Sequence, residues 1–493
     1  MTNNSAKATQ NGTGRRARPP SSNSTRSYWH RDPSDRLLGH RTTEELPTTA
    51  DVVVIGSGIT GTFAARELVT GGRSVLMLEA REACWGATGR ILTKYYQNGG
   101  HCQPAVWDAP ADVARFELGT FDLIASLVAK YNIPCDWQVI GGVHPIFSEE
   151  VLGAVKQQME RLQKYPDLQD RAILIQDKDE LARKHVPEAI AAVFQPNAAK
   201  CWPYKLVAWI LESLLDQHDA SMFNLQTSTL VDRIEGGQLS WSLHTKRGQV
   251  QARHVLLATN AYTSHLVPGM SGLITPVRGQ VCALEPPAGT TQLPHSYVWM
   301  KGADHQYLIH RGPEDTQDRS ARSADRSIIF GGERLAERLD GEEGVCNDDE
   351  INPIISQALH RCVSDALMLP LENGNGVEAQ VLDAKYEWTG IMGYSSDGGP
   401  WVGRLQGSLI GNSSDEGGSG AEDTGLWISA GYTGHGMPVA ARCGAAVAEM
   451  ILGRQGGIQV PGAWGVSEER AAAARGLAIP QTLRELLNEL PAE

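Results

Sequence analysis

The stretch that decides the fold is residues 51–79, DVVVIGSGITGTFAARELVTGGRSVLMLE. It opens with the apolar, β-branched run at 51–55, which predicts a buried parallel strand. Apolar residues at roughly helical spacing follow over 59–68, and a pair of glycines stands where a helix would be capped. Residues 74–78 predict a second buried strand. We therefore expect a β-α-β unit, the building block of a parallel sheet.

The turn between the first strand and the helix carries the pattern G-x-G-x-x-G at Gly56, Gly58 and Gly61. The first glycine permits a tight turn, the second lets the backbone approach a pyrophosphate, and the third lets helix and strand pack closely. The helix N-terminus offers free N–H groups, and Glu79 can accept hydrogen bonds from ribose hydroxyls. The full order of strand, glycines, helix, strand and acid favours a dinucleotide site over a purely structural turn. The binding residues predicted here are Gly56, Gly58, Ile59, Thr60, Gly61 and Glu79.

Three further stretches resemble a known family. Residues 80–90, AREACWGATGR, form a second loop of small residues. Near the other end of the chain, residues 386–403 read YEWTGIMGYSSDGGPWVG and residues 425–437 read GLWISAGYTGHGM. Together with the nucleotide motif, these stretches resemble the D-amino-acid-oxidase-like (DAO) superfamily of FAD enzymes, in particular its glycine oxidase, sarcosine oxidase and γ-glutamylputrescine oxidase branch. The resemblance covers roughly residues 50–455.

The resemblance implies an α/β fold, in which a Rossmann-like, GR2-type FAD-binding domain carries an inserted α+β substrate domain with an antiparallel sheet. A chain of 493 residues exceeds one compact core, which agrees with two domains. We predict a discontinuous FAD-binding domain at 49–110, 200–285 and 380–460, a substrate-binding domain at 111–199 and 286–379, and a C-terminal helical extension at 461–493.

Residues 1–48 differ in composition from the predicted domains. The first 31 residues contain no acid, but carry scattered Lys and Arg among Ser, Thr, Asn and Pro. Because too few apolar residues are present to bury a surface, we expect a disordered basic tail. An arginine-rich, acid-poor start also suits a mitochondrial transit peptide, but it lacks a convincing apolar face, so the cytoplasm is the preferred location.

The charge and the cysteines of the chain argue against several classes of partner and of site. The formal net charge of -13 argues against nucleic acid or anionic membranes. No apolar run approaches the roughly eighteen residues of a membrane span. The eight cysteines include no C-x-x-C pair. They therefore fit reduced thiols in a cytosolic compartment better than a disulfide framework or a metal site.

The resemblance also implies which residues contact FAD. The loop after Glu79 would wrap the pyrophosphate, the valine at 231 would touch the adenine side or serve only as core, and the G-x-x-G-H-G loop would lie beside the isoalloxazine ring. The residues so implied are Ala80, Arg81, Gly86, Ala87, Thr88, Gly89, Arg90, Val231, Ala258, Thr259, Asn260, Gly431, Gly434, His435, Gly436 and Met437. Sarcosine oxidases attach flavin through a cysteine near the segment that matches 390–397. No cysteine stands there, so we expect non-covalent FAD unless His101 forms the bond.

The chemistry follows from the same resemblance. No second strand–GxGxxG–helix unit occurs, which disfavours enzymes that exchange electrons with NAD(P)H in a separate domain. The family implies oxidation of a C–N bond of a small amine or amino acid to an imine, with dioxygen as acceptor and hydrogen peroxide as product. The amine must lose its proton before hydride transfer. Two alternatives stay open, a FAD-dependent 2-hydroxy-acid dehydrogenase of the same superfamily and a non-catalytic product.

Three side chains are candidates for catalysis. His435 stands in G-H-G and could stabilise the anionic edge of reduced flavin, or be a structural histidine in a glycine turn. His101 occupies a position where relatives approach the flavin. Arg278 could bind a substrate carboxylate bidentately, as could Arg311, although an ion pair within the protein is the alternative for each.

Residues 91–97, ILTKYYQ, interrupt the second loop. Relatives continue from G-x-x-G-R directly into N-G-G, which here stands at 98–100. The insertion is either a tolerated bulge, because loops accept insertions at modest entropic cost, or the tail of an unspliced intron, because Leu-Thr and Tyr-Gln can be encoded by splice-like sequences. Sequencing the cDNA across the loop decides between them, and a transcript with all seven codons excludes the intron.

Overall fold

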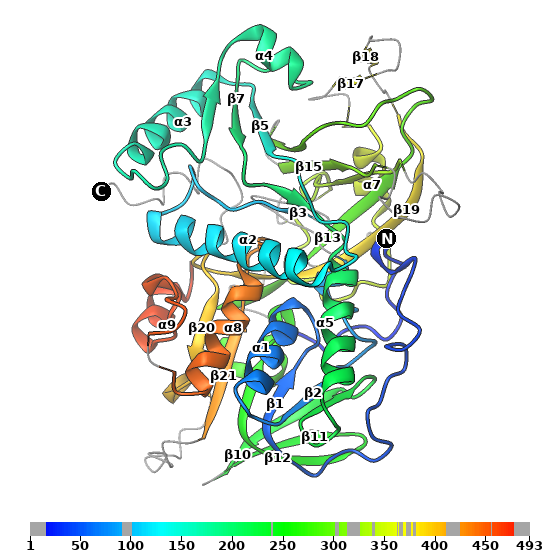
Figure 1. Cartoon of the computed structure of the whole chain (residues 1–493), viewed down its shortest axis with the longest axis vertical. Helices are drawn as coiled ribbons and strands as arrows, with labels where there is room; N and C mark the ends of the chain where they lie inside the picture. The colour runs from blue at the N-terminus through cyan, green and yellow to red at the C-terminus, as the bar shows by residue number, and fades with distance from the viewer. Residues whose placement is uncertain are drawn as a thin grey trace, which may run out of the picture.

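The computed structural model contains two large sheets (Figure 1). It describes residues 16–90, 101–237, 240–300, 305–312, 326–337, 341–361, 363, 368–370, 376–377, 381–410, 424–454 and 456–477. The insertion at 91–97 lies outside these residues. One sheet forms the lower half of the molecule in Figure 1 and the other forms the upper half.

The lower sheet is the nucleotide-binding sheet that the sequence predicts. Its strands are β1 (Thr49–Ile55), β2 (Val75–Leu78), β9 (Phe223–Gln226), β10 (Val231–Gly236), β11 (Trp241–Thr245), β12 (Gly248–Leu257), β20 (Trp401–Arg404) and β21 (Gly425–Ala430). β1 pairs in parallel with both β2 and β12, and β2 pairs in parallel with β9. The β-α-β unit at 51–79 is confirmed, because α1 (Ile59–Thr70) joins the two central strands.

Helices α1, α5 (Pro203–Gln217) and α8 (Ala440–Ile451) lie together in the lower half (Figure 1). α8 packs closely on α1 because Gly444 has no side chain, and a Cβ there would overlap the carbonyl oxygen of Thr60. This contact joins the C-terminal part of the chain to the nucleotide loop. α9 (Glu468–Ala474) packs on the same half, where Ala471 and Ala474 are buried.

The upper sheet is mostly antiparallel, and most of its strands fall within 111–199 and 286–379, the segments predicted to form the substrate-binding domain. Its strands, in spatial order, are β19 (Ala384–Ser395), β13 (Ile274–Leu284), β16 (Ile328–Gly331), β15 (His305–His310), β14 (Ser296–Met300), β5 (Gly142–Ile146), β7 (Ala191–Gln195) and β6 (Ile173–Ile175). β14 and β5 form the parallel pair within it. The upper half also holds α3 (Glu149–Leu162), α4 (Lys178–Arg183) and α7 (Pro353–Leu359).

Two strands differ from the predicted domain division. β13 and β19 fall within the segments 200–285 and 380–460, which we assigned to the FAD-binding domain. In the structure the two strands pair with each other along their length, with Ile274 opposite Ser395 at one end and Leu284 opposite Ala384 at the other. Both strands lie in the upper sheet. The two strands therefore lie in a different sheet from the other strands of their predicted segments, because strand pairing, which sequence position does not reveal, decides the sheet.

Smaller elements lie around the two sheets. Helix α2 (Ala111–Tyr131) lies at the level where the halves meet (Figure 1). β3 (His101–Cys102), β8 (Ala199–Lys200) and β4 (Gln138–Val139) form a short sheet, and β17 (Leu369–Pro370) pairs with β18 (Gly376–Val377). α6 (Thr263–Leu266) and the 3-10 turn at Asn260–Tyr262 follow β12. One hydrophobic cluster includes residues of α1, α5, β13 and β19, so the two halves share a core.

The N-terminal segment corrects a prediction. Residues 16–48 are ordered, so the expected disorder of 1–48 is wrong for this part, and residues 1–15 lie outside the described residues. Tyr28 and Trp29 are fully buried, and Arg31 lies over the rings of Tyr28 and Trp202 at 3.8 and 3.7 Å. A few large aromatic side chains anchor the segment because they enter a core that the rest of the chain builds.

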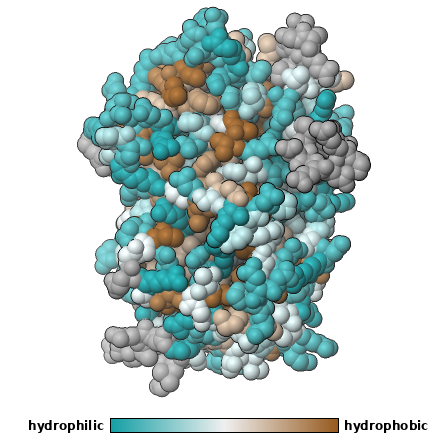
Figure 2. All heavy atoms as spheres, viewed as in Figure 1, coloured by the Kyte–Doolittle hydropathy of each residue, from teal (hydrophilic) through white to brown (hydrophobic). Residues whose placement is uncertain are grey.

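Polar residues dominate the face of the molecule that Figure 2 shows. The face in Figure 2 is largely hydrophilic, and its hydrophobic residues form small separate groups. None of the described helices combines the length and hydrophobicity that a membrane span requires.

Candidate functional site

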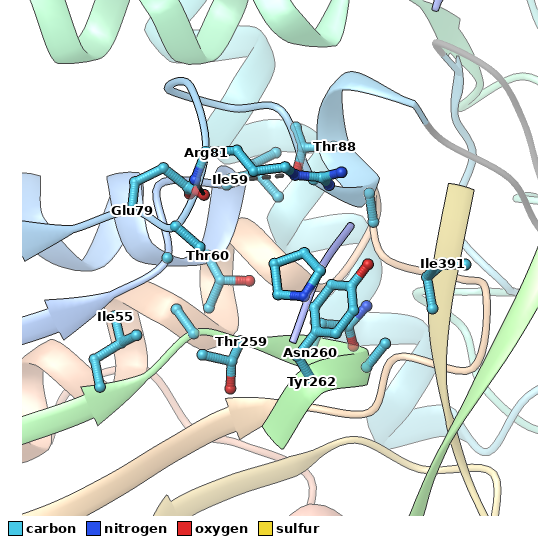
Figure 3. Close-up of a pocket in the computed structure, with 18 of the residues that line it drawn as sticks. Ile55, Ile59, Thr60, Glu79, Arg81, Thr88, Thr259, Asn260, Tyr262 and Ile391 are labelled. Atoms are coloured by element: carbon cyan, nitrogen blue, oxygen red, sulfur yellow. Dashed lines mark hydrogen bonds between the residues drawn. The ribbon is translucent and has the colours of Figure 1, made fainter. Parts of the chain in front are cut away.

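A cavity lies at the carboxyl ends of β1, β2 and β12, with about 1210 Å³ of space between its atoms, part of which is open solvent. Figure 3 shows Glu79 and Thr60 at one end of the labelled residues, Ile391 at the other, and Tyr262 between them. The predicted cofactor residues that line it are Gly56, Gly58, Ile59, Thr60, Glu79, Ala80, Arg81, Gly86, Ala87, Thr88, Val231, Ala258, Thr259, Asn260, Gly434, Gly436 and Met437. Segments far apart in the sequence therefore meet at one cavity.

The glycine loop has the geometry of a close backbone approach. Gly56 has a φ of 105°, and a Cβ there would lie 2.6 Å from the carbonyl oxygen of Ala258. Gly58 caps α1, so the first N–H groups of the helix face the cavity end of the turn. Gly61 does not line the cavity, and a Cβ there would overlap the carbonyl oxygen of Gly56. It supports helix–strand packing instead.

Glu79 is held by the loop that precedes α1. Its Oε2 accepts hydrogen bonds from the backbone N–H of Ser57 at 3.0 Å and from the Ser57 hydroxyl at 2.7 Å. Its Oε1 accepts from the backbone N–H of Arg81 at 2.9 Å. The carboxylate is therefore fixed at the cavity wall, with lone pairs left for a ribose hydroxyl.

The second loop contributes one hydroxyl and one buried ion pair. The Oγ1 of Thr88 accepts from the Ile59 N–H at 3.0 Å, which ties the loop to the start of α1. Arg81 lines the cavity and donates to Oδ2 of Asp348 at 2.9 Å. Arg90, which is fully buried, lies 3.3 Å from the same carboxylate, and burial lowers its pKa to about 10. Arg90 and Gly89 do not line the cavity, so both shape the loop from behind.

The glycine-rich loop near the C-terminus is also part of the cavity wall. Its Gly434, Gly436 and Met437 line the wall, whereas Gly431 does not. The Gly431 N–H donates to Oδ1 of Asn260 at 3.0 Å, and this bond fixes the loop against the turn after β12.

His435 does not line the cavity. Its Nε2 lies 2.6 Å from Oε2 of Glu117, a buried residue of α2 that also accepts from the Ala105 N–H at 2.6 Å. Asp108 is buried close by, and burial followed by the charge of Glu117 raises the pKa of Asp108 to about 7. The histidine therefore belongs to an acidic cluster behind the loop.

The other two predicted catalytic residues lie outside the cavity wall as well. His101 is fully buried, with its Nε2 2.7 Å from the Ser296 hydroxyl, and burial lowers its pKa. Arg278 lies 2.5 Å from Glu342 and 2.6 Å from Glu350. Because two carboxylates occupy its guanidinium, the structure favours the ion-pair alternative over binding of a substrate carboxylate. Arg311 likewise pairs with Asp136 at 2.6 Å.

Sequence reasoning missed part of the wall. The further lining residues are Pro20, Ile55, Leu78, Thr229, Leu230, Ala261, Tyr262, His265, Leu266, Ile391, Met392, Tyr432 and Ala440. Several continue predicted stretches and could have been found by extending them by one residue. Pro20 could not, because nothing in the basic N-terminal segment indicates a contact with the nucleotide loop. Among the described residues, no three His, Cys, Asp or Glu side chains form a group that could hold a metal ion.

Comparison with known proteins identifies the family. The model of the family "FAD dependent oxidoreductase" (DAO) matches residues 51–450. The chain is 23% identical to the "Probable oxidoreductase OrdL" of Haemophilus influenzae, with 87% of this chain and 86% of that protein covered. It is also 23% identical to the Escherichia coli "Gamma-glutamylputrescine oxidoreductase", with 82% and 84% covered.

Solved structures agree with the fold. Glycine oxidase from Geobacillus kaustophilus superposes with a TM-score of 0.63 at 15% identity, and 85% of this chain and 99% of that chain are covered. L-proline dehydrogenase from P. horikoshii superposes with a TM-score of 0.60 at 21% identity, and 82% of this chain and 94% of that chain are covered. With the match over residues 51–450 and the cavity at the nucleotide loop, the chain belongs to the DAO family of FAD-dependent oxidoreductases.

Proposed function

We propose that the protein oxidises a C–N bond of a small amine or amino acid to an imine, with dioxygen as electron acceptor and hydrogen peroxide as product. The observation that carries this proposal is one cavity, lined by both the nucleotide loop and the loop 434–437. The curated and solved relatives named above include enzymes of amine and amino-acid oxidation, which supports this substrate class.

The residues at the nucleotide end fit FAD. Gly56 leaves room that a side chain would fill, Gly58 and the start of α1 present N–H groups for a pyrophosphate, and Glu79 presents a fixed carboxylate for a ribose. When bound, FAD would supply the chemistry by accepting hydride from the substrate carbon. The chain's own residues would bind the substrate, orient it and exclude water from it.

The apolar part of the wall favours a neutral amine. It includes Ile391, Met392, Met437 and Tyr432, and burial raises the pKa of the Tyr432 hydroxyl, which therefore stays protonated. Because the charged form of a substrate amine is disfavoured in such surroundings, the ammonium is expected to release its proton more readily there than in water. Deprotonation prepares the lone pair that drives hydride loss.

We further propose that FAD is bound without a covalent link. His101, the residue we considered for such a link, has its Nε2 at the Ser296 hydroxyl and does not line the cavity. Denaturation of the holoprotein should release all flavin into solution. Flavin that stays with the precipitated chain would contradict this part of the proposal.

The location proposed for this activity is the cytoplasm. The cysteines in the described part of the chain are free thiols, which suits a reducing compartment. Cell fractionation with an antibody to the full chain tests this, and recovery with mitochondria would favour the transit-peptide alternative.

The decisive experiment uses the purified holoprotein under anaerobic conditions. Amines, N-methyl amino acids, D-amino acids and 2-hydroxy acids are added in turn, and the flavin absorbance is followed. We expect bleaching by a member of the nitrogen-containing sets and release of peroxide when air is admitted. Bleaching by 2-hydroxy acids alone, or reoxidation by an artificial acceptor without peroxide, would contradict the proposal.

A further inference from the structure

We propose that residues 16–27, here named the N-terminal strap, form a clasp over the FAD cavity, so that FAD leaves only when the strap detaches. The inference rests on the proposed function in one respect, namely that FAD occupies this cavity. The strap precedes the region that matches the family, which begins at residue 51.

One end of the strap is fixed to α6. The backbone N–H of Ala17 donates to the hydroxyl of Ser264 at 2.9 Å, and Arg16 Nε donates to the Ser264 carbonyl oxygen at 3.2 Å. Ala17 and Ser264 are both buried. The two residues after Ser264, His265 and Leu266, line the cavity. This end is therefore attached directly to the cavity wall.

The middle of the strap is itself part of the wall. Pro20 lines the cavity, while Arg18, Pro19 and Ser22 on either side of it are exposed to solvent. The strap at this point thus has the cavity on one side and solvent on the other. A cofactor that enters or leaves past Pro20 has to displace it.

The other end of the strap is bound to Asp348. The Ser21 hydroxyl donates to Oδ1 of Asp348 at 2.5 Å, and the Thr25 N–H donates to the Asp348 carbonyl oxygen at 2.7 Å. The same carboxylate accepts from Arg81, a cavity-lining residue. Asp348 is fully buried, so the strap, the loop after β2 and the upper half of the molecule meet at one carboxylate.

The two ends of the N-terminal segment differ in how they are held. Tyr28 and Trp29, directly after the strap, are fully buried in the core. The strap itself is held by hydrogen bonds, and most of its residues are exposed or half-buried. A single hydrogen bond has a small net value, whereas burial of a large aromatic side chain contributes more. The strap can therefore open while its base stays anchored.

The test measures how fast FAD dissociates from the full-length holoprotein. Ser264→Ala and Ser21→Ala each remove one hydroxyl that fixes the strap, and neither residue lines the cavity. The Ser264 hydroxyl makes a neutral hydrogen bond, so Ser264→Ala should release FAD roughly three- to tenfold faster. The Ser21 hydroxyl bonds a carboxylate, so Ser21→Ala should release FAD roughly tenfold faster or more. The double variant should show about the product of the two effects, because the two hydroxyls bond different partners, Ala17 and Asp348.

Ser34→Ala is the matched control. Ser34 lies in the same N-terminal segment beyond the strap, its hydroxyl donates to Glu212, and it does not line the cavity. Free flavin fluorescence after dilution reports the rate, and thermal unfolding of each apoprotein reports general stability. Unchanged rates in both strap variants, or an equal increase in Ser34→Ala, would overturn the clasp. A wild-type protein that binds no FAD would instead refute the proposed function.

Discussion

At the scale of single residues, the contact between His435 and Glu117 decides what the histidine can do. The 2.6 Å bond from Nε2 to the buried carboxylate holds the imidazole behind the loop 434–437, whose backbone lines the cavity. Glu117→Gln keeps the shape but removes the charge that fixes the ring. We expect anaerobic flavin reduction to slow by roughly tenfold to a hundredfold, since a charge-assisted hydrogen bond contributes about 1.5–3 kcal/mol.

The control for this variant is Asp122→Asn, which removes an exposed carboxylate from the same helix, α2. Stopped-flow absorbance gives the reduction rate, and the flavin content of the purified protein shows whether binding is intact. If Glu117→Gln reduces flavin as fast as Asp122→Asn does, the bond has no part in the reaction.

Asp108 gives a prediction for the pH dependence of stability. Its pKa is raised to about 7 in the folded protein, mainly by burial and then by Glu117, while His435 and Arg161 act in the opposite direction. The folded chain therefore binds this proton more tightly than the unfolded chain. The stabilisation is full below the ordinary pKa of about 4 and is lost as the pH rises through about 7.

The variant Asp108→Asn should lack this loss. We expect it to be more stable relative to wild type at about pH 8 than at about pH 5, because the amide has no charge to bury. Urea unfolding at the two pH values measures the difference. A difference between variant and wild type that is the same at both values would show that Asp108 does not titrate in this way.

The position of a residue could be predicted from the sequence where it depends on the residue's own stretch of chain. Gly56, Gly58 and Glu79 line the cavity because a turn, a helix start and a strand end place them there. The position of a side chain such as Arg278 depends on partners that the sequence separates widely. Glu342 and Glu350 follow it by more than sixty residues, so no local pattern could show that its charge is neutralised.

At the scale of elements, the packing of α8 on α1 ties the C-terminal part of the chain to the nucleotide loop. A Cβ at Gly444 would overlap the backbone of Thr60, a cavity residue, so Gly444→Ala must displace α8 or the loop. Overpacking of this kind costs about 1–3 kcal/mol, which exceeds the roughly 1 kcal/mol that alanine adds in helix propensity. We expect lower thermal stability and weaker FAD binding, measured by calorimetry and flavin titration.

Gly153→Ala is the matched control for this element. Gly153 lies in α3, and a Cβ there would meet no atom within 4 Å. The same substitution should therefore raise stability slightly, by up to about 1 kcal/mol. An equal response of the two variants would mean that the α1–α8 contact is looser than the structure shows.

The helices and strands that could be predicted best from the sequence are those that pair with neighbours close by in the chain. The β-α-β unit was predictable since strand, turn and helix are consecutive and each has its own pattern. β13 and β19 carry strand patterns too, but they are about one hundred residues apart and pair along their length. Their place in the upper sheet is fixed by that pairing and by the shared core, which composition and periodicity do not contain.

At the scale of the whole molecule, the N-terminal segment joins the two halves. Trp29 is fully buried, its carbonyl oxygen accepts from the Trp202 indole at 2.8 Å, and Arg311 lies 5.5 Å over its ring. Trp202 precedes a helix of the lower half, and Arg311 follows a strand of the upper half. Disorder was the wrong expectation here because two aromatic anchors outweigh a polar composition.

Trp29→Ala tests that role directly. Removing a buried tryptophan should lower the free energy of unfolding by about 3–5 kcal/mol, since the core cannot close over so large a cavity. Leu38→Ala, in the same segment but 41% exposed, should change it by less than about 1 kcal/mol. Urea unfolding followed by tryptophan fluorescence and by circular dichroism measures both variants.

Because Trp29 contacts both halves, the two probes should still report one transition in wild type, and Trp29→Ala should separate them. A Trp29→Ala protein as stable as Leu38→Ala would show that the segment only lies on the surface, and would remove the base from which the strap opens.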